Sequence, residues 1–367
     1  MEHQLTIHLD QKPIYNILLE QNFEKLKDAL LELGYENRKL LIVTESNLSS
    51  LYLEGVKELL QPIFREIVCF IFPAGEQQKQ LSTVSDIYTT LIEHQFDRKD
   101  LLLALGGGVT GDLTGFAAAT YLRGIDFVQV PTSLLAQVDS SIGGKTGVDY
   151  QSYKNMVGAF HQPSLVYINI STLQTLPEKE FHSGLGEIFK HGLIKDASYF
   201  QWLWDNREGI QNREFDVLCQ MIVRSCQIKG DVVEHDPTEQ GERALLNFGH
   251  TLGHSIEKLM NFSLLHGECV AIGMELAALI SWKRGLISKE DLDSIQDFCT
   301  YFSITPLPRQ LDFKELVAAT KLDKKMEQGQ IKFILLKQIG EAYIDRTVTE
   351  EEMLWALEQY DRFERQF

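Results

Sequence analysis

Through the first third of the chain, short apolar runs rich in Leu and β-branched residues alternate with segments of helical periodicity. The clearest strand candidates are Lys39–Thr44 and Glu66–Phe72, and helix-period segments cover 23–33 and 81–94. This alternation predicts βα units arranged around a parallel sheet. Ligands of open parallel sheets bind beyond the carboxyl ends of the strands, so we expect a nucleotide near these strand ends.

A glycine-rich turn follows the next apolar run. Gly106, Gly108 and Gly111 fit the pattern G-x-G-x-x-G, with a strand candidate before them and an Ala-rich helix after them. Glycines allow the backbone to approach a pyrophosphate, and the helix N-terminus supplies N–H donors and partial positive charge. The pattern favours phosphate or dinucleotide binding, and the alternative is a tight strand-to-helix turn that holds no ligand.

The acid that binds the ribose of a dinucleotide usually follows such a turn by about twenty residues. Here it would be Asp126, which precedes the next strand instead of ending it, so Glu45 at an earlier strand end is the better candidate. Further on, Gly143-Gly-Lys-Thr146 resembles the end of a P-loop. Asp139 occupies the place of the first P-loop glycine and no apolar strand leads in, so we reject a Walker A motif. Lys145 and Lys154 still suit an anionic group.

From about residue 176 the pattern changes to helical periodicity, and no strand alternation returns until 331–336. The sequence therefore predicts an α/β protein with two domains. Residues 1–176 form a Rossmann-like nucleotide-binding domain with a parallel sheet, and 177–367 form a mostly α-helical domain.

Three histidines in the second domain are candidate metal ligands. His250 and His254 stand four residues apart, which places them on one face of a helix, and His266 follows after a short loop. Upstream, Glu187 and His191 share another helical face with Lys190. The histidines could hold a metal or form a hydrogen-bonded seam between helices. Glu187 and His191 could be two further ligands or a surface ion pair.

Composition narrows the possible functions. The 367 residues carry a formal charge of -17, which disfavours binding to nucleic acid or to a membrane surface. The five cysteines are scattered and form no C-x-x-C motif, as expected of reduced thiols in a cytosol. No signal peptide or membrane span is evident, so we expect a cytoplasmic protein.

Taken together, stretches from about residue 45 to residue 340 resemble the 3-dehydroquinate synthase family. The stretches are, in order, Gly75-Glu-Gln-Gln-Lys79, Gly106-Gly-Gly-Val-Thr-Gly-Asp112, Pro131-Thr-Ser-Leu-Leu-Ala-Gln-Val-Asp-Ser-Ser141, Gly143-Gly-Lys-Thr-Gly147, Lys154-Asn-Met-Val-Gly-Ala-Phe160, Gly186-Glu-Ile-Phe-Lys190, Leu246-Asn-Phe-Gly-His-Thr251 and His266-Gly-Glu268. Any one of them is a weak signal, but their order and combination are specific. The resemblance implies an NAD-binding α/β domain, a helical domain, an active site between them and a homodimer.

The resemblance also implies ligands for two cofactors. NAD would be held by Glu45, Asn47, Gly75, Glu76, Lys79, Gly108, Val109, Thr110, Gly111, Asp112, Thr132, Ser133, Asp139, Lys145, Lys154, Thr172, Leu173, Gln174 and Thr175. A Zn²⁺ or Co²⁺ would be held by Glu187, His250 and His266, with His254 beside it as a proton-transfer residue. Spacing alone favours His250 with His254, and His191 as a further candidate, so the family changes the expected ligand set.

The reaction implied by the resemblance converts 3-deoxy-D-arabino-heptulosonate 7-phosphate to 3-dehydroquinate and phosphate, the second step of the shikimate pathway. Transient oxidation by NAD⁺ is followed by β-elimination of phosphate, re-reduction and an intramolecular aldol closure. The phosphate pocket of the family is matched by Lys145, Asn155, Lys190 and Asn247, with Arg123 from a partner subunit. Its carboxylate clamp is matched by Lys229, Arg243 and Lys337.

Small departures from the family pattern remove no catalytic group. Glu45 stands where Asp is usual, Ser133 where Thr is usual, and Asp149 where Asn is common. The nearest rivals are sister cyclases that act on other sugar phosphates, which the set Lys229, Arg243 and Asn247 disfavours. A net oxidoreductase of the iron-dependent alcohol dehydrogenase type is a second alternative, and a binding protein without activity is a third.

Overall fold

The computed structural model describes residues 4–151, 153–237, 239, 241–261, 263–303, 307, 311–320, 326–327 and 330–364. The chain divides into two compact units. Unit 1 comprises residues 1–176 and 218–234, and unit 2 comprises 177–217 and 235–367. Most of helix α9 (Phe215–His235) therefore belongs to unit 1, although its sequence lies between segments of unit 2.

Unit 1 is built on a seven-stranded sheet in the order β1-β2-β9-β6-β5-β3-β4. All neighbours in it are parallel except the pair β1–β2. The strands are β1 (Gln4–Leu9), β2 (Lys12–Glu20), β3 (Lys39–Glu45), β4 (Glu66–Phe72), β5 (Leu101–Gly106), β6 (Asp126–Pro131) and β9 (Leu165–Asn169). The predicted parallel sheet is confirmed, whereas the sequence analysis did not identify the β1–β2 hairpin at the edge.

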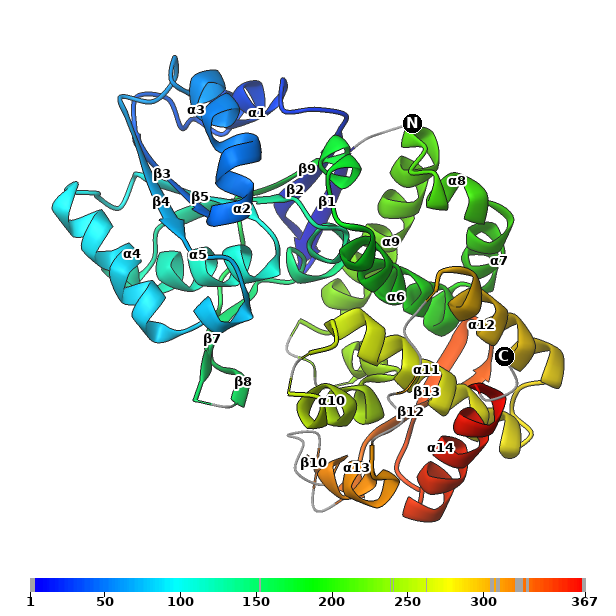
Figure 1. Ribbon diagram of the computed structural model, residues 1–367. Helices are drawn as coiled ribbons and strands as arrows, with labels where there is room; N and C mark the ends of the chain where they lie inside the picture. Colours follow the sequence, from blue (N-terminus) through cyan, green and yellow to red (C-terminus); the bar gives the residue numbers. More distant parts are fainter. Residues whose placement is uncertain are drawn as a thin grey trace. The chain divides into compact units, whose positions relative to one another are not determined.

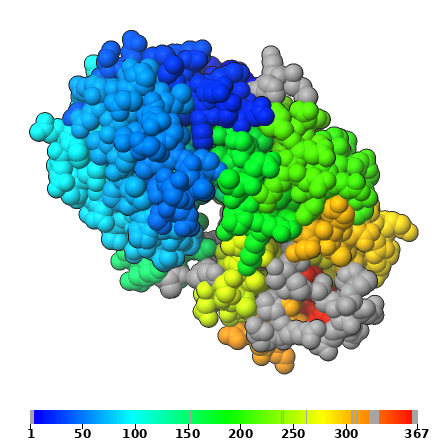
Figure 2. Space-filling view, turned by 45° about the horizontal axis from the view of Figure 1, so that its top comes forward, coloured from blue at the N-terminus to red at the C-terminus, as the bar shows by residue number. Residues whose placement is uncertain are grey.

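Helices cover both faces of this sheet (Figure 1). Alternate strand residues point to opposite faces. Leu40 and Ile42 of β3 pack in one core with α1 (Leu26–Glu32) and α3 (Glu54–Leu60), whereas Leu41 and Val43 pack in another with α4 (Leu81–Glu93) and α5 (Gly108–Thr120). Figure 2 turns the top of Figure 1 toward the viewer, and blue atoms of the N-terminal part of the chain form the surface of unit 1 there. Burial on both faces explains why the strands read as continuous apolar runs.

Shorter elements complete unit 1. They are α2 (Ser46–Leu48), η1 (Ser49–Leu53), η2 (Glu76–Gln78), η3 (Tyr121–Arg123), η4 (Ala136–Ser140) and η5 (Ile170–Gln174). A separate hairpin of β7 (Lys145–Tyr150) and β8 (Tyr153–Phe160) projects beyond the sheet in Figure 1. Gly143 and Gly144, both with positive φ, lead into β7. No strand-to-helix phosphate loop forms at Lys145, in agreement with the rejected Walker A motif.

Unit 2 is mostly helical, as the sequence predicts. Its helices are α6 (Glu178–Lys195), α7 (Ala197–Asp205), α8 (Arg207–Gln211), η6 (Glu242–Asn247), α10 (His250–Leu259), α11 (His266–Lys283), α12 (Lys289–Tyr301), α13 (Phe313–Thr320) and α14 (Glu350–Glu364). The strands are β10 (Met326–Glu327), β11 (Gln330–Ile331), β12 (Phe333–Gln338) and β13 (Glu341–Asp345), which pair as two short hairpins. No helix in the described part of the chain combines the length and the apolar character that a membrane crossing requires.

Candidate active site

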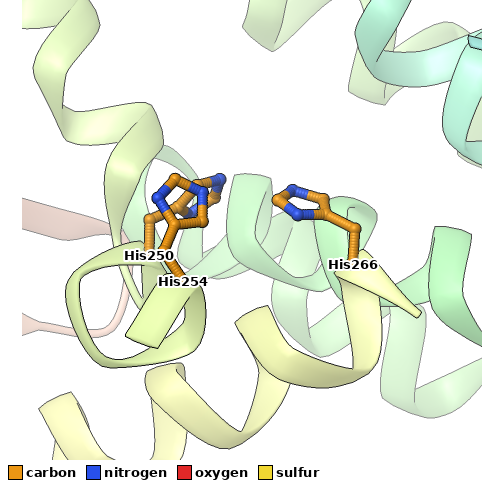
Figure 3. A group of neighbouring side chains, drawn as sticks. All are labelled: His250, His254 and His266. Carbon is orange, nitrogen blue, oxygen red and sulfur yellow. The ribbon is translucent and has the colours of Figure 1, made fainter. Parts of the chain in front are cut away.

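The three histidines predicted as metal candidates come together in unit 2 (Figure 3). The ring of His250 lies 5.1 Å from that of His254 and 5.3 Å from that of His266, centroid to centroid. The rings of His254 and His266 are 5.8 Å apart. His250 and His254 stand on α10 and His266 begins α11, so two helices bring the imidazoles to one place.

A carboxylate from a third helix faces two of these rings. Oε1 of Glu187, on α6, lies 3.7 Å from Nε2 of His250 and 3.8 Å from Nε2 of His266. Zn²⁺ bonds of about 2.1 Å in a tetrahedral site place neighbouring donor atoms about 3.4 Å apart. Glu187 is only 1% exposed, and no donor among the described residues binds its Oε1. A buried carboxylate oxygen without a donor beside two imidazole nitrogens fits a divalent cation.

Close backbone packing holds α6, α10 and α11 together around this cluster. A Cβ on Gly267 would lie 1.8 Å from the carbonyl oxygen of Ser183 on α6, and one on Gly253 would lie 2.7 Å from that of Cys269. Only glycine permits such approaches. Gly267 also donates its N–H to Oγ of Ser183 at 3.1 Å. These contacts position His266, the preceding residue, opposite Glu187.

Lys190 lies next to the candidate metal ligands. Its ammonium donates to the second carboxylate oxygen, Oε2, of Glu187, one helical turn away on α6. Lys190 is 1% exposed, and a buried lysine requires a counter-charge. Glu187 thus directs one oxygen to the lysine and the other to the histidines. His191 is fully buried on the same helix.

Other predicted residues of unit 2 lie before α10 and on the β12–β13 hairpin. Arg243 is 3% exposed and donates from Nη1 to the carbonyl of Pro237 at 2.6 Å. Asn247 donates from Nδ2 to Oε1 of Glu239 at 2.8 Å. Lys337 forms an exposed ion pair with Glu341 at 2.7 Å.

The main chain at Lys332, which no sequence motif indicated, also approaches the histidine helix. The carbonyl of Lys332 accepts from Oγ1 of Thr251, the residue after His250, at 3.5 Å. No spacing in the sequence relates Lys332 to α10, because the approach is made by the chain entering β12. The main chain at Lys332 therefore approaches α10 next to His250.

In unit 1 most of the predicted NAD residues follow the carboxyl ends of the sheet strands, whereas Lys145 and Lys154 stand on the β7–β8 hairpin. The strands end in register, with Glu45 opposite Phe72 and Gly106 opposite Pro131. Along the chain, β4 lies on one side of β3 and β5 on the other, so the strand order reverses between β3 and β5. Ligands bind at this kind of switch point in open α/β sheets.

The glycine-rich turn lies at that switch point. Gly107 precedes the first residue of α5, and Gly108, Val109, Thr110, Gly111 and Asp112 form the first turn of the helix. A Cβ on Gly111 would lie 2.6 Å from Oε1 of Gln129 on β6, so this glycine allows the helix to pack closely on the sheet. Asp126, the ribose candidate that the sequence disfavours, opens β6 at the opposite end of the strands.

The carboxylate of Glu45 caps the short helix after β3. It accepts from the N–H of Asn47 at 2.7 Å and of Leu48 at 3.1 Å. Ser133 and Thr132 follow β6, where Thr132 is 3% exposed and donates its N–H to the carbonyl of Gly106. The last group, Thr172, Leu173, Gln174 and Thr175, follows β9.

Three predicted residues form a polar cluster around Lys79. Its ammonium lies 2.6 Å from Oδ2 of Asp112 and 2.6 Å from Oδ1 of Asn155. Burial by itself would lower the pKa of Lys79, but the facing carboxylates of Asp112 and Glu76 raise it above its usual value. Gly75 has φ of 121° and leads into η2, where Glu76 lies 3.5 Å from Lys154. The neighbouring carboxylates thus keep the ammonium of Lys79 charged at the sheet edge.

The remaining predicted residues of unit 1 lie in three places. Lys145 is exposed on β7, and Asn155 on β8 has φ of 54°. Lys229 on α9 donates to both the carbonyl and the carboxylate of Asp139 at 2.5 Å. Arg123 is exposed at the end of α5, in a turn where it and Leu122 have positive φ.

Solved structures of two cyclases share this architecture. The 2-epi-5-epi-valiolone synthase of Streptomyces hygroscopicus subsp. jinggangensis, with NAD⁺ and Zn²⁺ bound, matches with a TM-score of 0.88 and 28% identity, over 98% of this chain and 99% of that one. A 2-deoxy-scyllo-inosose synthase complexed with carbaglucose-6-phosphate, NAD⁺ and Co²⁺ has a TM-score of 0.86 and 23% identity, over 97% and 99%. The fold is that of the sugar-phosphate cyclases.

The sequence comparisons identify the family within that class. The family model of the 3-dehydroquinate synthase N-terminal part matches residues 69–183, and that of its C-terminal part matches 184–326. The 3-dehydroquinate synthase of Shewanella pealeana is 43% identical over 353 residues, which are 96% of this chain and 98% of that protein. The chain belongs to the 3-dehydroquinate synthase family and is an enzyme of that type.

Proposed function

We propose that this protein converts 3-deoxy-D-arabino-heptulosonate 7-phosphate to 3-dehydroquinate and phosphate, with catalytic NAD and one divalent metal ion. The observation that supports it best is the buried Oε1 of Glu187, which has no hydrogen-bond donor in the described part of the chain. It lies 3.7 and 3.8 Å from two imidazole nitrogens in a chain of this family. Unit 1 would carry the nucleotide, and unit 2 would carry the metal.

Glu187, His250 and His266 would hold the metal, as Zn²⁺ or Co²⁺. One carboxylate and two imidazoles leave a coordination position open for substrate. When bound, the metal would polarise the hydroxyl that is oxidised and lower its pKa. His254, whose ring lies 5.1 Å from that of His250, would move the proton of that hydroxyl oxygen.

NAD would bind at the carboxyl edge of the unit 1 sheet. The first turn of α5 would face the pyrophosphate, because helix N-termini favour anions. Glu45 or Asn47 at the end of β3 would contact the ribose. When bound, NAD⁺ would supply a reversible acceptor for the hydride of the C5–H bond, while the C5 hydroxyl loses its proton, so the overall reaction involves no net oxidation.

Cationic and amide side chains would recognise the two anionic groups of the substrate. The phosphate would be bound by Lys145, Asn155, Lys190 and Asn247. The carboxylate, which is the second anionic group of the substrate, would be bound by Lys229, Arg243 and Lys337. Charge-assisted hydrogen bonds from lysine and arginine are suited to both groups, and they explain how a chain of net charge -17 can bind an anion.

We also propose that the enzyme is a cytoplasmic homodimer in which Arg123 completes the phosphate pocket of the partner subunit. Among the described residues no ion-pair partner of Arg123 is found, and its left-handed backbone (φ 68°) is unusual for a residue with a side chain. Strained residues of this kind concentrate at functional positions. All five cysteines are free thiols, as in proteins of a reducing compartment.

The test is phosphate release from 3-deoxy-D-arabino-heptulosonate 7-phosphate with catalytic NAD⁺, before and after treatment with EDTA and re-addition of Zn²⁺ or Co²⁺. We expect metal-dependent release without accumulation of NADH. Release from a neutral sugar phosphate instead would indicate a sister cyclase. Stoichiometric NADH from a simple alcohol, with no phosphate release, would contradict the proposal.

A further inference from the structure

A second buried carboxylate faces the histidine cluster from the side opposite Glu187. Oε2 of Glu257 lies 3.7 Å from Nδ1 of His266, and Glu257 is 4% exposed. Nε2 of the same ring lies 3.8 Å from Oε1 of Glu187. The imidazole of His266 thus stands between two buried carboxylates, with one ring nitrogen toward each.

The other imidazole that faces Glu187 is oriented in the same way. Nδ1 of His250 lies 3.2 Å from the carbonyl oxygen of Phe248, while its Nε2 faces Glu187. A carbonyl oxygen can only accept, so Nδ1 of His250 is the donor in this contact, and in the neutral ring Nε2 carries the lone pair. An acceptor that fixes the tautomer of a histidine in this way is typical of metal-binding imidazoles.

The position of Glu257 follows from the sequence of α10. His250, His254 and Glu257 are spaced by four and three residues, which puts all three on one helical face. Gly253 lies between them and allows close contact with α11, since its Cβ would lie 2.7 Å from the carbonyl of Cys269. The helix that supplies one imidazole thus also brings a carboxylate to the imidazole of the neighbouring helix.

We propose that Glu257 is a positioning residue for the metal site: its carboxylate, 3.7 Å from Nδ1 of His266, attracts the N–H at that nitrogen, holds the ring so that Nε2 points to Glu187, and strengthens Nε2 as a metal ligand. The inference rests on the proposed metal site. Glu257 itself does not bind the metal. Loss of such an outer-shell partner lowers metal affinity by about 10–100-fold in characterised sites.

The test compares Glu257→Gln and Glu257→Asp with the wild type as full-length proteins. Zn²⁺ affinity is measured by competition with a chromogenic chelator, and the visible absorption spectrum is recorded with Co²⁺ in place of Zn²⁺. For Glu257→Gln we expect a Zn²⁺ dissociation constant about 10–100-fold higher and a shifted Co²⁺ spectrum. Glu257→Asp, which keeps the charge, should recover part of the affinity. Thermal unfolding of the metal-free proteins reveals any variant that is merely misfolded.

Glu275→Gln is the matched control, because Glu275 on α11 is equally buried at 4% exposure. It should bind Zn²⁺ as the wild type does. Wild-type affinity and an unchanged Co²⁺ spectrum in Glu257→Gln would overturn the role of Glu257. His250→Ala separates the two ideas: if it retains one metal ion per chain, the proposed metal site itself is wrong. If it loses the metal while Glu257→Gln is unaffected, only the positioning role fails.

Discussion

At the scale of single residues, Lys190 makes the sharpest prediction. Lys190 is buried beside Glu187 and would bind the phosphate group that leaves. Lys190→Ala therefore removes a positive charge from the place where the leaving phosphate gains negative charge. We expect kcat for phosphate release to fall by about 100-fold or more, as when one stabilising group is removed from an active site. NAD affinity, measured by fluorescence titration, should change by less than about twofold, because the proposed nucleotide residues belong to unit 1 and Lys190 belongs to unit 2.

A second lysine on the same helix provides the control. Lys195 pairs with Glu242 near the surface of unit 2, with side-chain exposures of 26% and 40%. Lys195→Ala removes the same charge from α6 without disturbing Glu187, and its turnover should match the wild type. Equal losses of activity in both variants would show that the effect comes from α6 as a whole and would remove Lys190 from the site.

The candidate site shows what residue spacing can and cannot predict. The four-residue interval puts His250 and His254 on one face of α10, and their rings do lie side by side. Spacing alone left Glu187 open between a metal ligand and a surface ion pair, because its approach to His250 and His266 depends on how α6 packs against two other helices. The family motifs supplied that residue. Neither source indicated Glu257, since its contact with His266 exists only in three dimensions.

At the scale of elements, the packing of α6 against α11 depends on Gly267. In Gly267→Ala the new Cβ would meet the carbonyl oxygen of Ser183 at 1.8 Å, so the helices must separate. We expect a loss of about 3 kcal/mol or more in the free energy of unfolding, typical of severe overpacking. Metal content, measured on the same preparation, should fall as well, because His266 is displaced with the helix end.

Gly55→Ala should have the opposite effect on stability from Gly267→Ala. Gly55 lies within α3 and a Cβ there would meet nothing within 4 Å. Gly55→Ala should therefore stabilise the protein by about 0.5–1 kcal/mol, the usual gain from replacing glycine inside a helix. Urea denaturation of both variants makes the comparison. A Gly267→Ala protein as stable as the wild type would contradict the packing derived from the backbone.

Arg284 joins three elements of unit 2. It donates from Nε and Nη2 to Glu352 on α14, and from Nη1 to Asp345 on β13 at 3.0 Å. The bond from Arg284 holds the pKa of Glu352 below its usual value. Burial would raise the pKa of Asp345, but bonds from Thr347 and Arg284 outweigh it and lower that pKa too. Carboxylates with lowered pKa values stabilise the fold above the unfolded pKa of about 4, and this stability is lost as the pH falls through the folded values.

Arg284→Met should therefore cost about 1–2 kcal/mol at pH 7, in keeping with a partly exposed, bidentate ion pair. The difference from the wild type should shrink as the pH falls from about 5 to about 3, where the carboxylates become protonated. Arg284→Lys keeps the charge but not the two parallel hydrogen bonds, so it should be intermediate. Denaturant unfolding at several pH values tests this, and a pH-independent difference would contradict the electrostatic origin.

At the scale of the whole molecule, the order of helices and strands along the chain was largely predictable from the sequence. The assignment of each element to one of the two compact units was not. The strands β3, β4, β5 and β6 follow from apolar runs and turn residues. The placement of 218–234 in unit 1 does not, since helical periodicity indicates a buried face but not the core against which it packs. The contacts that fix it are tertiary, such as Lys229 with Asp139 and His8 with Glu234 at 3.1 Å.

The proposed dimer can be tested through its own symmetry. If Arg123 completes the site of the partner subunit, a protomer with Arg123→Ala and one with Lys190→Ala are each inactive as homodimers. In their hybrid dimer one site combines an intact Lys190 with an intact Arg123 from the other subunit. Random exchange makes half of the dimers hybrid, so about a quarter of the wild-type activity should return on mixing.

Two alternatives predict no recovery of activity in the same mixture. An Arg123 that serves its own subunit leaves every site defective, so mixing restores nothing. A monomeric enzyme likewise shows no recovery, and sedimentation of the unmixed proteins distinguishes these two cases. Equilibration at low protein concentration, followed by concentration and assay, allows the subunits to exchange. Recovery near one quarter would require both a twofold assembly and an arginine that acts across it, which no measurement on a single variant could establish.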